Sequence, residues 1–238
     1  MAGKSKTDTK AAERAERLAE LKKQAKAQER RRNLMVGGVV AVVLVLIGIT
    51  FYLVSRSNDV DATAAGQSDY GVAIGSPDAP HDLVIYEDFL CPYCGELEAA
   101  TGDQLAQLAD DGKVYVDYRP FTLLSNIGTY SARSTAAFGV VLDKSGPEVA
   151  KKFHDLLYDN QPEESASSFP DADALIATAV EAGATEADVR PGIEEGENDF
   201  AKNATKEALA AGVKGTPTMV LDGEVYSGTP QELLDELA

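Results

Sequence analysis

The only two cysteines of the chain, Cys91 and Cys94, lie between a strand-like apolar run at 83–86 and a helix-forming stretch at 96–109. Two thiols at this spacing can close a small disulfide ring with little backbone movement. The pattern therefore predicts a strand, a turn that carries both thiols, and a helix. It also indicates a pair that cycles between dithiol and disulfide and so transfers two electrons.

The four residues of this motif have different expected roles. Cys91 stands at the start of the predicted helix, where free N–H groups and the macrodipole favour a thiolate, so we expect it to be the nucleophile. Cys94, one turn further, is then the resolving thiol. Pro92 suits the first helical position because that position needs no N–H donor, and Tyr93 completes the motif.

Three other interpretations of the cysteine pair have less support in the sequence. A zinc site needs four ligands, and the two histidines, His81 and His154, have no ligand-like spacing to each other or to the cysteines. A purely structural disulfide would close so small a ring that it stabilises little. Two unrelated core thiols are the third alternative. We therefore predict no metal and no cofactor other than a redox-active Cys91–Cys94 disulfide, with each histidine an ordinary loop or helix residue.

An apolar stretch at 34–54 predicts a membrane span. It holds 21 apolar or small residues without a charge, enough for a helix to cross a hydrocarbon core about 30 Å thick. Segment 1–33 carries eleven cations and five anions, a net charge of +6. The positive-inside rule then places this basic segment in the cytoplasm and the C-terminal domain on the other side of the bilayer.

A cleaved signal peptide is the competing interpretation of this region. Ala62-Thr63-Ala64 has the small-x-small form of a cleavage site. The apolar stretch, however, exceeds the roughly 7–15 residues of a signal-peptide core, and the candidate site lies well beyond its end, so we favour a retained anchor.

The rest of the chain is strongly acidic. The whole chain has a net charge of −17, so the residues after the basic segment carry −23. Such a surface excludes nucleic acid as a partner and is typical of a soluble extracytoplasmic domain.

The remaining pattern predicts a linker at 55–69 and one domain at 70–238. A second strand is expected at 113–118, a helical insertion at about 125–212, strands at 219–221 and 224–226, and a helix at 230–237. The helical stretch should form four or five helices, with breaks at 146–147, 165–170, 183 and 191–192.

Together these features resemble the DsbA-like family of the thioredoxin superfamily, the membrane-anchored or secreted bacterial thiol-disulfide oxidoreductases. The resemblance covers about 70–238. It rests on Cys91-Pro-Tyr-Cys94 after a strand, on Gly215-Thr216-Pro217-Thr218 before the late hairpin, and on the helical block between them. The opening at 73–80 and the run at 86–94 add to it.

The resemblance implies an α/β thioredoxin fold with an inserted helical subdomain, here preceded by a single transmembrane helix. It implies that Pro217 is a cis proline facing the cysteines and that Thr216 offers backbone groups to a substrate peptide. It further implies disulfide donation to exported protein thiols and reoxidation by a DsbB- or VKOR-type membrane protein. The expected location is the bacterial cell membrane, with the catalytic domain extracytoplasmic.

The sequence also departs from related patterns. The buried carboxylate that many thioredoxins carry six residues before the nucleophile is replaced by Ile85, and Glu87 and Asp88 follow instead. Either carboxyl could assist proton transfer from Cys94, although a solvated loop position is the simpler expectation. Tyr93 stands where strong oxidants carry histidine, so we expect a potential below the extreme of roughly −120 mV.

Two further functions stay open at this point. One is a disulfide reductase or isomerase on the same side of the membrane, and the other is a non-catalytic peptide-binding or assembly factor.

Overall fold

A computed structural model describes residues 60–238. The predicted basic segment 1–33 and the predicted span 34–54 lie outside the described residues. Within 60–238, no helix is both long and apolar enough to cross a membrane.

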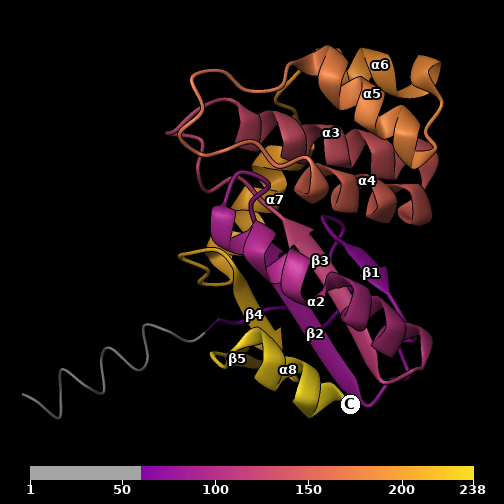
Figure 1. Cartoon of the computed structure of the whole chain (residues 1–238), viewed down its shortest axis with the longest axis vertical. Helices are drawn as coiled ribbons and strands as arrows, with labels where there is room; N and C mark the ends of the chain where they lie inside the picture. Colours follow the sequence, from indigo (N-terminus) through magenta and orange to yellow (C-terminus); the bar gives the residue numbers. More distant parts are fainter. Residues whose placement is uncertain (1–59) are drawn as a thin grey trace, which may run out of the picture. The chain divides into compact units, whose positions relative to one another are not determined.

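A five-stranded sheet forms the centre of the domain (Figure 1). Its strands follow the order β1-β3-β2-β4-β5, with β2 and β3 parallel and every other neighbouring pair antiparallel. The strands are β1 (Val72–Ile74), β2 (His81–Glu87), β3 (Val114–Pro120), β4 (Thr218–Leu221) and β5 (Glu224–Tyr226). The four strands predicted from the sequence are confirmed, whereas the three-residue β1 was not predicted.

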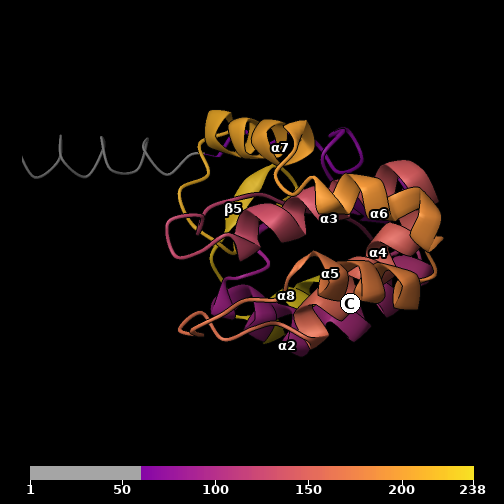
Figure 2. The same cartoon turned by 90° about the horizontal axis from the view of Figure 1, so that it is seen from above.

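Side chains of the central strand β2 alternate between two apolar clusters, because successive strand residues point to opposite faces of a sheet. Leu83 and Ile85 belong to the larger cluster, with α2 (Pro92–Asp110) and α8 (Pro230–Leu237). Val84 and Tyr86 belong to the smaller one, with α7 (Asp199–Ala210). The helices α2 and α8 thus cover one face of the sheet and α7 the other (Figures 1 and 2).

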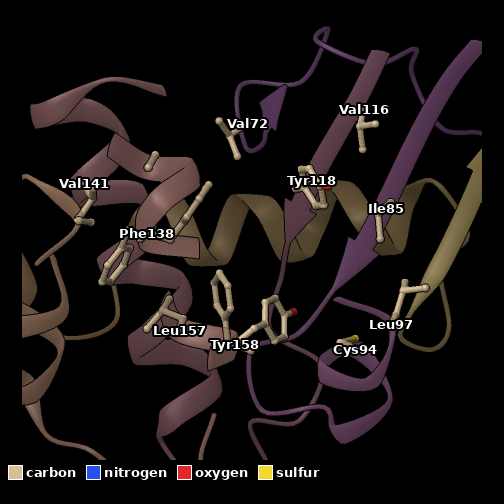
Figure 3. Packing of buried hydrophobic residues seen from close by; sticks show 14 of the residues in the cluster. Val72, Ile85, Cys94, Leu97, Val116, Tyr118, Phe138, Val141, Leu157 and Tyr158 are labelled. Atoms are coloured by element: carbon tan, nitrogen blue, oxygen red, sulfur yellow. The ribbon is translucent and has the colours of Figure 1, made fainter. Parts of the chain in front are cut away.

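The helical insertion follows β3 and returns to β4. It contains α3 (Tyr130–Ser145), α4 (Pro147–Asp159), α5 (Ala172–Ala182), α6 (Glu186–Glu194) and α7. Side chains of this block pack against the same large cluster as the sheet, and Figure 3 shows Phe138 and Leu157 of the block on one side of Tyr118 and Ile85. The insertion and the sheet therefore share one core.

One predicted helix break is wrong. The breaks at 146–147, 165–170 and 183 are confirmed, but Pro191 lies inside α6 and Gly192 follows it in the same helix. Proline removes one backbone hydrogen bond there. The helix persists because Val189 and Ile193, one turn apart, are both buried in the core.

The predicted linker 55–69 is also corrected, for the part that the structure describes. Ala65 N–H donates to both carboxylate oxygens of Asp82 at 2.9 Å. The Arg119 guanidinium donates to the carbonyls of Thr63 and Ala64 at 3.0 and 2.7 Å. The segment before β1 is thus attached to the domain, which begins earlier than residue 70.

Candidate active site

Cys91 and Cys94 lie at the start of α2, immediately after the central strand β2. Cys91 is the N-cap residue and Pro92 occupies the first turn. Both thiols are free, with exposed fractions of 5% for Cys91 and 0% for Cys94, whereas Tyr93 between them is 67% exposed. Figure 3 shows Cys94 inside the core, near Tyr158. Only the first sulfur of the pair therefore lies at the edge of the buried core.

The segment before β4 lies against this sulfur. The Thr216–Pro217 peptide bond is cis, as the resemblance implied. The Cys91 thiol donates to the carbonyl of Thr216 at 3.4 Å, so the fold joins two motifs that are 125 residues apart. The first cysteine, Pro217 and the half-buried Thr216 consequently share one site.

The pKa values of the two thiols are shifted in opposite directions. A hydrogen bond from the Cys94 side chain, aided by the Thr216 side chain and by backbone groups of Cys94 and Tyr93, outweighs burial and lowers the pKa of Cys91 to about 6. Burial, the hydrogen bond to Cys91 and the negative charge of Glu87 raise the pKa of Cys94 well above its usual value. At neutral pH the reduced pair is therefore a Cys91 thiolate beside a Cys94 thiol.

The reactivity of the reduced protein should follow the Cys91 pKa of about 6. The thiolate fraction at pH 7 is then roughly nine tenths, against about one hundredth for an ordinary thiol of pKa near 9, so thiolate-dependent alkylation should be faster by about 90-fold at most. The iodoacetamide rate, measured between pH 4 and 9, should rise as the pH increases through about 6. Thr216→Val removes the side-chain hydroxyl and should move the midpoint upward. A wild-type midpoint at the ordinary thiol value would contradict this assignment.

Asp88 is not the solvated loop residue that the sequence suggested. It is fully buried, and its carboxylate accepts hydrogen bonds from the N–H groups of Leu90, Leu123 and Leu124 and from the hydroxyl of Ser131. These bonds tie the turn before Cys91 to the loop after β3 and to α3. The contacts give Asp88 a structural role, which the sequence analysis did not consider.

Glu87 is also fully buried, again unlike a solvated loop residue. Its Oε1 accepts a hydrogen bond from Nε2 of His154 at 2.5 Å, and His154 Nδ1 donates to Asp155 at 2.8 Å. Burial opposes a charged imidazole, but the Glu87 carboxylate and the bond to Asp155 raise the pKa of His154 to about 9. Glu87 and His154 therefore form a buried ion pair close enough to Cys94 to influence its pKa. The sequence analysis missed His154 because its partner on β2 is 67 residues away.

Gln161, after α4, was missed as well. Its Nε2 donates to the carbonyls of Phe89 and Cys91 at 3.1 and 2.9 Å. A Cβ atom on Gly95 would lie 2.3 Å from Gln161 Oε1, so the glycine after Cys94 leaves room for this side chain. The amide thus holds the backbone of the cysteine turn from the helical insertion.

Gln161→Leu should destabilise the protein by about 1–3 kcal/mol, because it removes the donor from two part-buried carbonyls. Urea denaturation of the reduced protein measures the effect. Gln231→Leu is the matched control, since this exposed amide donates to the Asp235 carboxylate within α8 and its loss should leave the midpoint unchanged. Equal midpoints for the two variants would exclude a supporting role for Gln161.

A reactive thiol at the N-terminus of a helix after a central strand, with a resolving thiol one turn inside and a cis proline opposite, defines a redox protein of the thioredoxin class. The family model described as Thioredoxin matches residues 67–237. The chain belongs to this family, and within the superfamily it is a DsbA-like protein.

Two solved structures from Mycobacterium tuberculosis are similar to the chain. Reduced DsbA is 32% identical, with a TM-score of 0.62, and the match covers 71% of this chain and 90% of DsbA. The reduced disulfide bond oxidoreductase DsbG is 34% identical, with a TM-score of 0.63, and the match covers 73% of this chain and 88% of DsbG. MdbA, a thiol-disulfide oxidoreductase from Corynebacterium diphtheriae, shares the fold at 23% identity and a TM-score of 0.60, over 75% of this chain and 94% of MdbA.

Among curated proteins, the serine/threonine-protein kinase PknE of Mycobacterium tuberculosis is 30% identical over 103 residues. The match covers 41% of this chain and 18% of the kinase. The chain thus spans less than a fifth of this relative's length. The likeness to PknE concerns one part of that protein.

Proposed function

We propose that this protein is a membrane-tethered, extracytoplasmic thiol-disulfide oxidoreductase that donates its Cys91–Cys94 disulfide to exported proteins. The observation that carries the proposal is the contrast between the two thiols: Cys91, at the edge of the core, has a pKa of about 6, whereas the fully buried Cys94 has a raised pKa. The relatives with DsbA and DsbG folds support oxidoreductase chemistry.

The reaction proceeds through a mixed disulfide. A substrate thiolate attacks Cys91 Sγ, the Cys91–Cys94 bond breaks, and Cys94 leaves as a thiolate that takes up a proton. A second substrate thiolate then attacks the substrate sulfur bound to Cys91 and releases Cys91 as a thiolate. The substrate has lost two electrons and the enzyme pair has gained them.

The low pKa of Cys91 supports the oxidising direction. A thiol of low pKa is a good leaving group in the second step. The same interactions stabilise the reduced pair relative to the disulfide, and a stabilised reduced form raises the reduction potential.

Substrate binding is proposed at the segment before β4. The backbone of Thr216, beside Cys91, can pair with an extended peptide, and cis Pro217 adjoins it in the same turn. Tyr93, two residues after the nucleophile, offers an exposed aromatic surface. Thr216 and Tyr93 would thus contact an unfolded substrate chain.

The membrane location and the reoxidation partner are part of the proposal. The apolar stretch 34–54 and the basic segment before it support a bilayer anchor with the domain outside. The chain has no third cysteine that could reoxidise the pair. Electrons would therefore leave through a second membrane protein of the DsbB or VKOR type.

The reduction potential of the pair tests the direction. The full chain, kept in solution by a non-ionic detergent, is equilibrated with glutathione redox buffers, and the dithiol fraction is read by alkylation. A potential above about −200 mV supports the disulfide donor. A value near that of thioredoxin, roughly −270 mV, would overturn the oxidant and indicate a reductase.

A further inference from the structure

Three side chains from distant parts of the chain meet behind the cysteine pair. Glu87 comes from the end of β2, Glu98 from α2 and His154 from α4. One nitrogen or oxygen from each lies within 4.8 Å of the other two. The proposed disulfide chemistry at Cys91 does not use Glu98 or His154.

Two carboxylate oxygens of this cluster lack a partner. Glu87 Oε2, on a side chain with no exposed surface, and Glu98 Oε1 are buried without a hydrogen bond to any residue in 60–238. Buried polar atoms in native proteins are nearly always bound to protein, water or an ion. These two oxygens are therefore open to a partner that can bind both carboxyl groups.

The histidine of the cluster is already oriented for a ligand. His154 Nδ1 donates to Asp155 at 2.8 Å, which turns Nε2 toward Glu87. Histidines that bind metal ions commonly donate their other ring nitrogen to a carboxylate in this way, which fixes the ring and its tautomer. This arrangement is independent of the orphaned oxygens and indicates the same class of ligand.

We propose that Glu87, Glu98 and His154 form a binding site for one divalent transition-metal ion of the zinc class. One imidazole nitrogen and two carboxylates are ligands that Zn²⁺ accepts, and three protein ligands leave a position for water. The two negative carboxylates balance the double positive charge of the ion. With a neutral imidazole as the third ligand, the loaded site has no net charge.

The site has an access route and one competing cation. A surface depression of about 300 Å³ reaches Glu98, Lys151 and Asp155, so an ion can enter from solvent.

Binding of the ion displaces the proton between His154 and Glu87. The 2.5 Å distance between His154 Nε2 and Glu87 Oε1 then increases, because two ligand atoms at about 2.1 Å from one metal ion lie more than 2.5 Å apart. The Lys151 ammonium, bound to Asp155 and 4.3 Å from the centre of the Tyr118 ring, opposes the added charge.

Isothermal titration calorimetry with ZnCl₂ tests the site. The protein is the full chain with Cys91→Ser and Cys94→Ser, because free thiols bind Zn²⁺ themselves. We expect one ion per chain and at least tenfold weaker binding in Glu98→Gln and in His154→Gln. His81→Gln is the matched control, since His81 binds Asp222 at the other end of β2 and should leave Zn²⁺ affinity unchanged.

If His154→Gln fails to fold because its side chain is buried, two other variants, Glu98→Gln and Lys151→Met, still test the metal site. Glu98 is only half-buried, so Glu98→Gln should keep the native circular dichroism spectrum and still lose affinity. Lys151→Met removes the opposing charge and should strengthen binding. Absence of a 1:1 complex, or equal affinity in a folded Glu98→Gln variant, would overturn the proposal. Neither result bears on the disulfide chemistry, which the reduction potential tests separately.

Discussion

Cys94→Ser should trap the protein in covalent complexes with its substrates. When Cys91 of this variant attacks a substrate disulfide, one substrate sulfur bonds to Cys91 and the other leaves as a thiolate. Without Cys94 no enzyme thiol can displace the bound sulfur, so mixed disulfides accumulate. Disulfide transfer to a reduced model protein should fall to the rate of uncatalysed exchange, a loss on the order of 10³-fold or more. Non-reducing electrophoresis after mixing with an oxidised substrate protein reads the complexes directly.

The Cys91→Ser variant, compared with Cys94→Ser, distinguishes the nucleophile from the resolving thiol. Cys94 is fully buried and its thiol is kept protonated by its surroundings, so it cannot replace the nucleophile. Cys91→Ser should therefore lose the same activity but form no complexes. Complexes that form through Cys94 in this variant would reverse the roles of the two thiols. If the variant with both Cys91→Ser and Cys94→Ser still performed the protein's function in cells, the protein would be a peptide-binding protein and not an oxidoreductase.

Much of the fold could be predicted because its signals are local. The strands at 83–86 and 113–118 are apolar or alternating, and the helix at 230–237 begins at a proline after Thr229, whose side chain and Glu232 form a capping box. The cysteine pair is likewise a local motif, and its place at the start of α2 follows from the strand and helix on either side. Each of these features can be recognised within about ten residues.

The parts of the site that could not be predicted depend on distant contacts. Glu87 and Asp88 look like loop carboxylates in the sequence, yet both are buried because partners from α3, α4 and the loop after β3 reach them. His154 shows no ligand spacing along the chain, since its neighbours come from β2 and α2. Local patterns carry no information on which distant side chain will satisfy a buried charge.

The start of the domain was misplaced for the same reason. Residues 60–69 are short on bulky apolar side chains, as a linker would be. The structure nevertheless attaches them through backbone groups, which bind Asp82, Asp117 and Arg119. Backbone hydrogen bonds leave no trace in composition, so this attachment could not be inferred from the sequence.

Arg119→Met should destabilise the protein by about 3–5 kcal/mol, because removing one partner of a buried ion pair leaves the other uncompensated. The Arg119 side chain is 3% exposed and bonds Asp117 at 2.9 Å. It also donates to Tyr86 and to the carbonyls of Thr63 and Ala64. The variant therefore loses both the partner of a buried carboxylate and the bonds that hold residues 63 and 64. In urea this corresponds to a midpoint lower by about 2 M.

Two comparisons separate the buried charge from a general loss of arginine. Arg190→Gln removes an exposed guanidinium with ion pairs to Asp173, Glu186 and Glu194, and its urea midpoint should stay close to that of the wild type because exposed pairs are screened by water. Adding Asp117→Asn to Arg119→Met should recover part of the loss, since it removes the stranded charge while the lost contacts to residues 63 and 64 remain lost. If the double variant is as unstable as Arg119→Met alone, the attachment of the N-terminal segment, and not the ion pair, provides the stability.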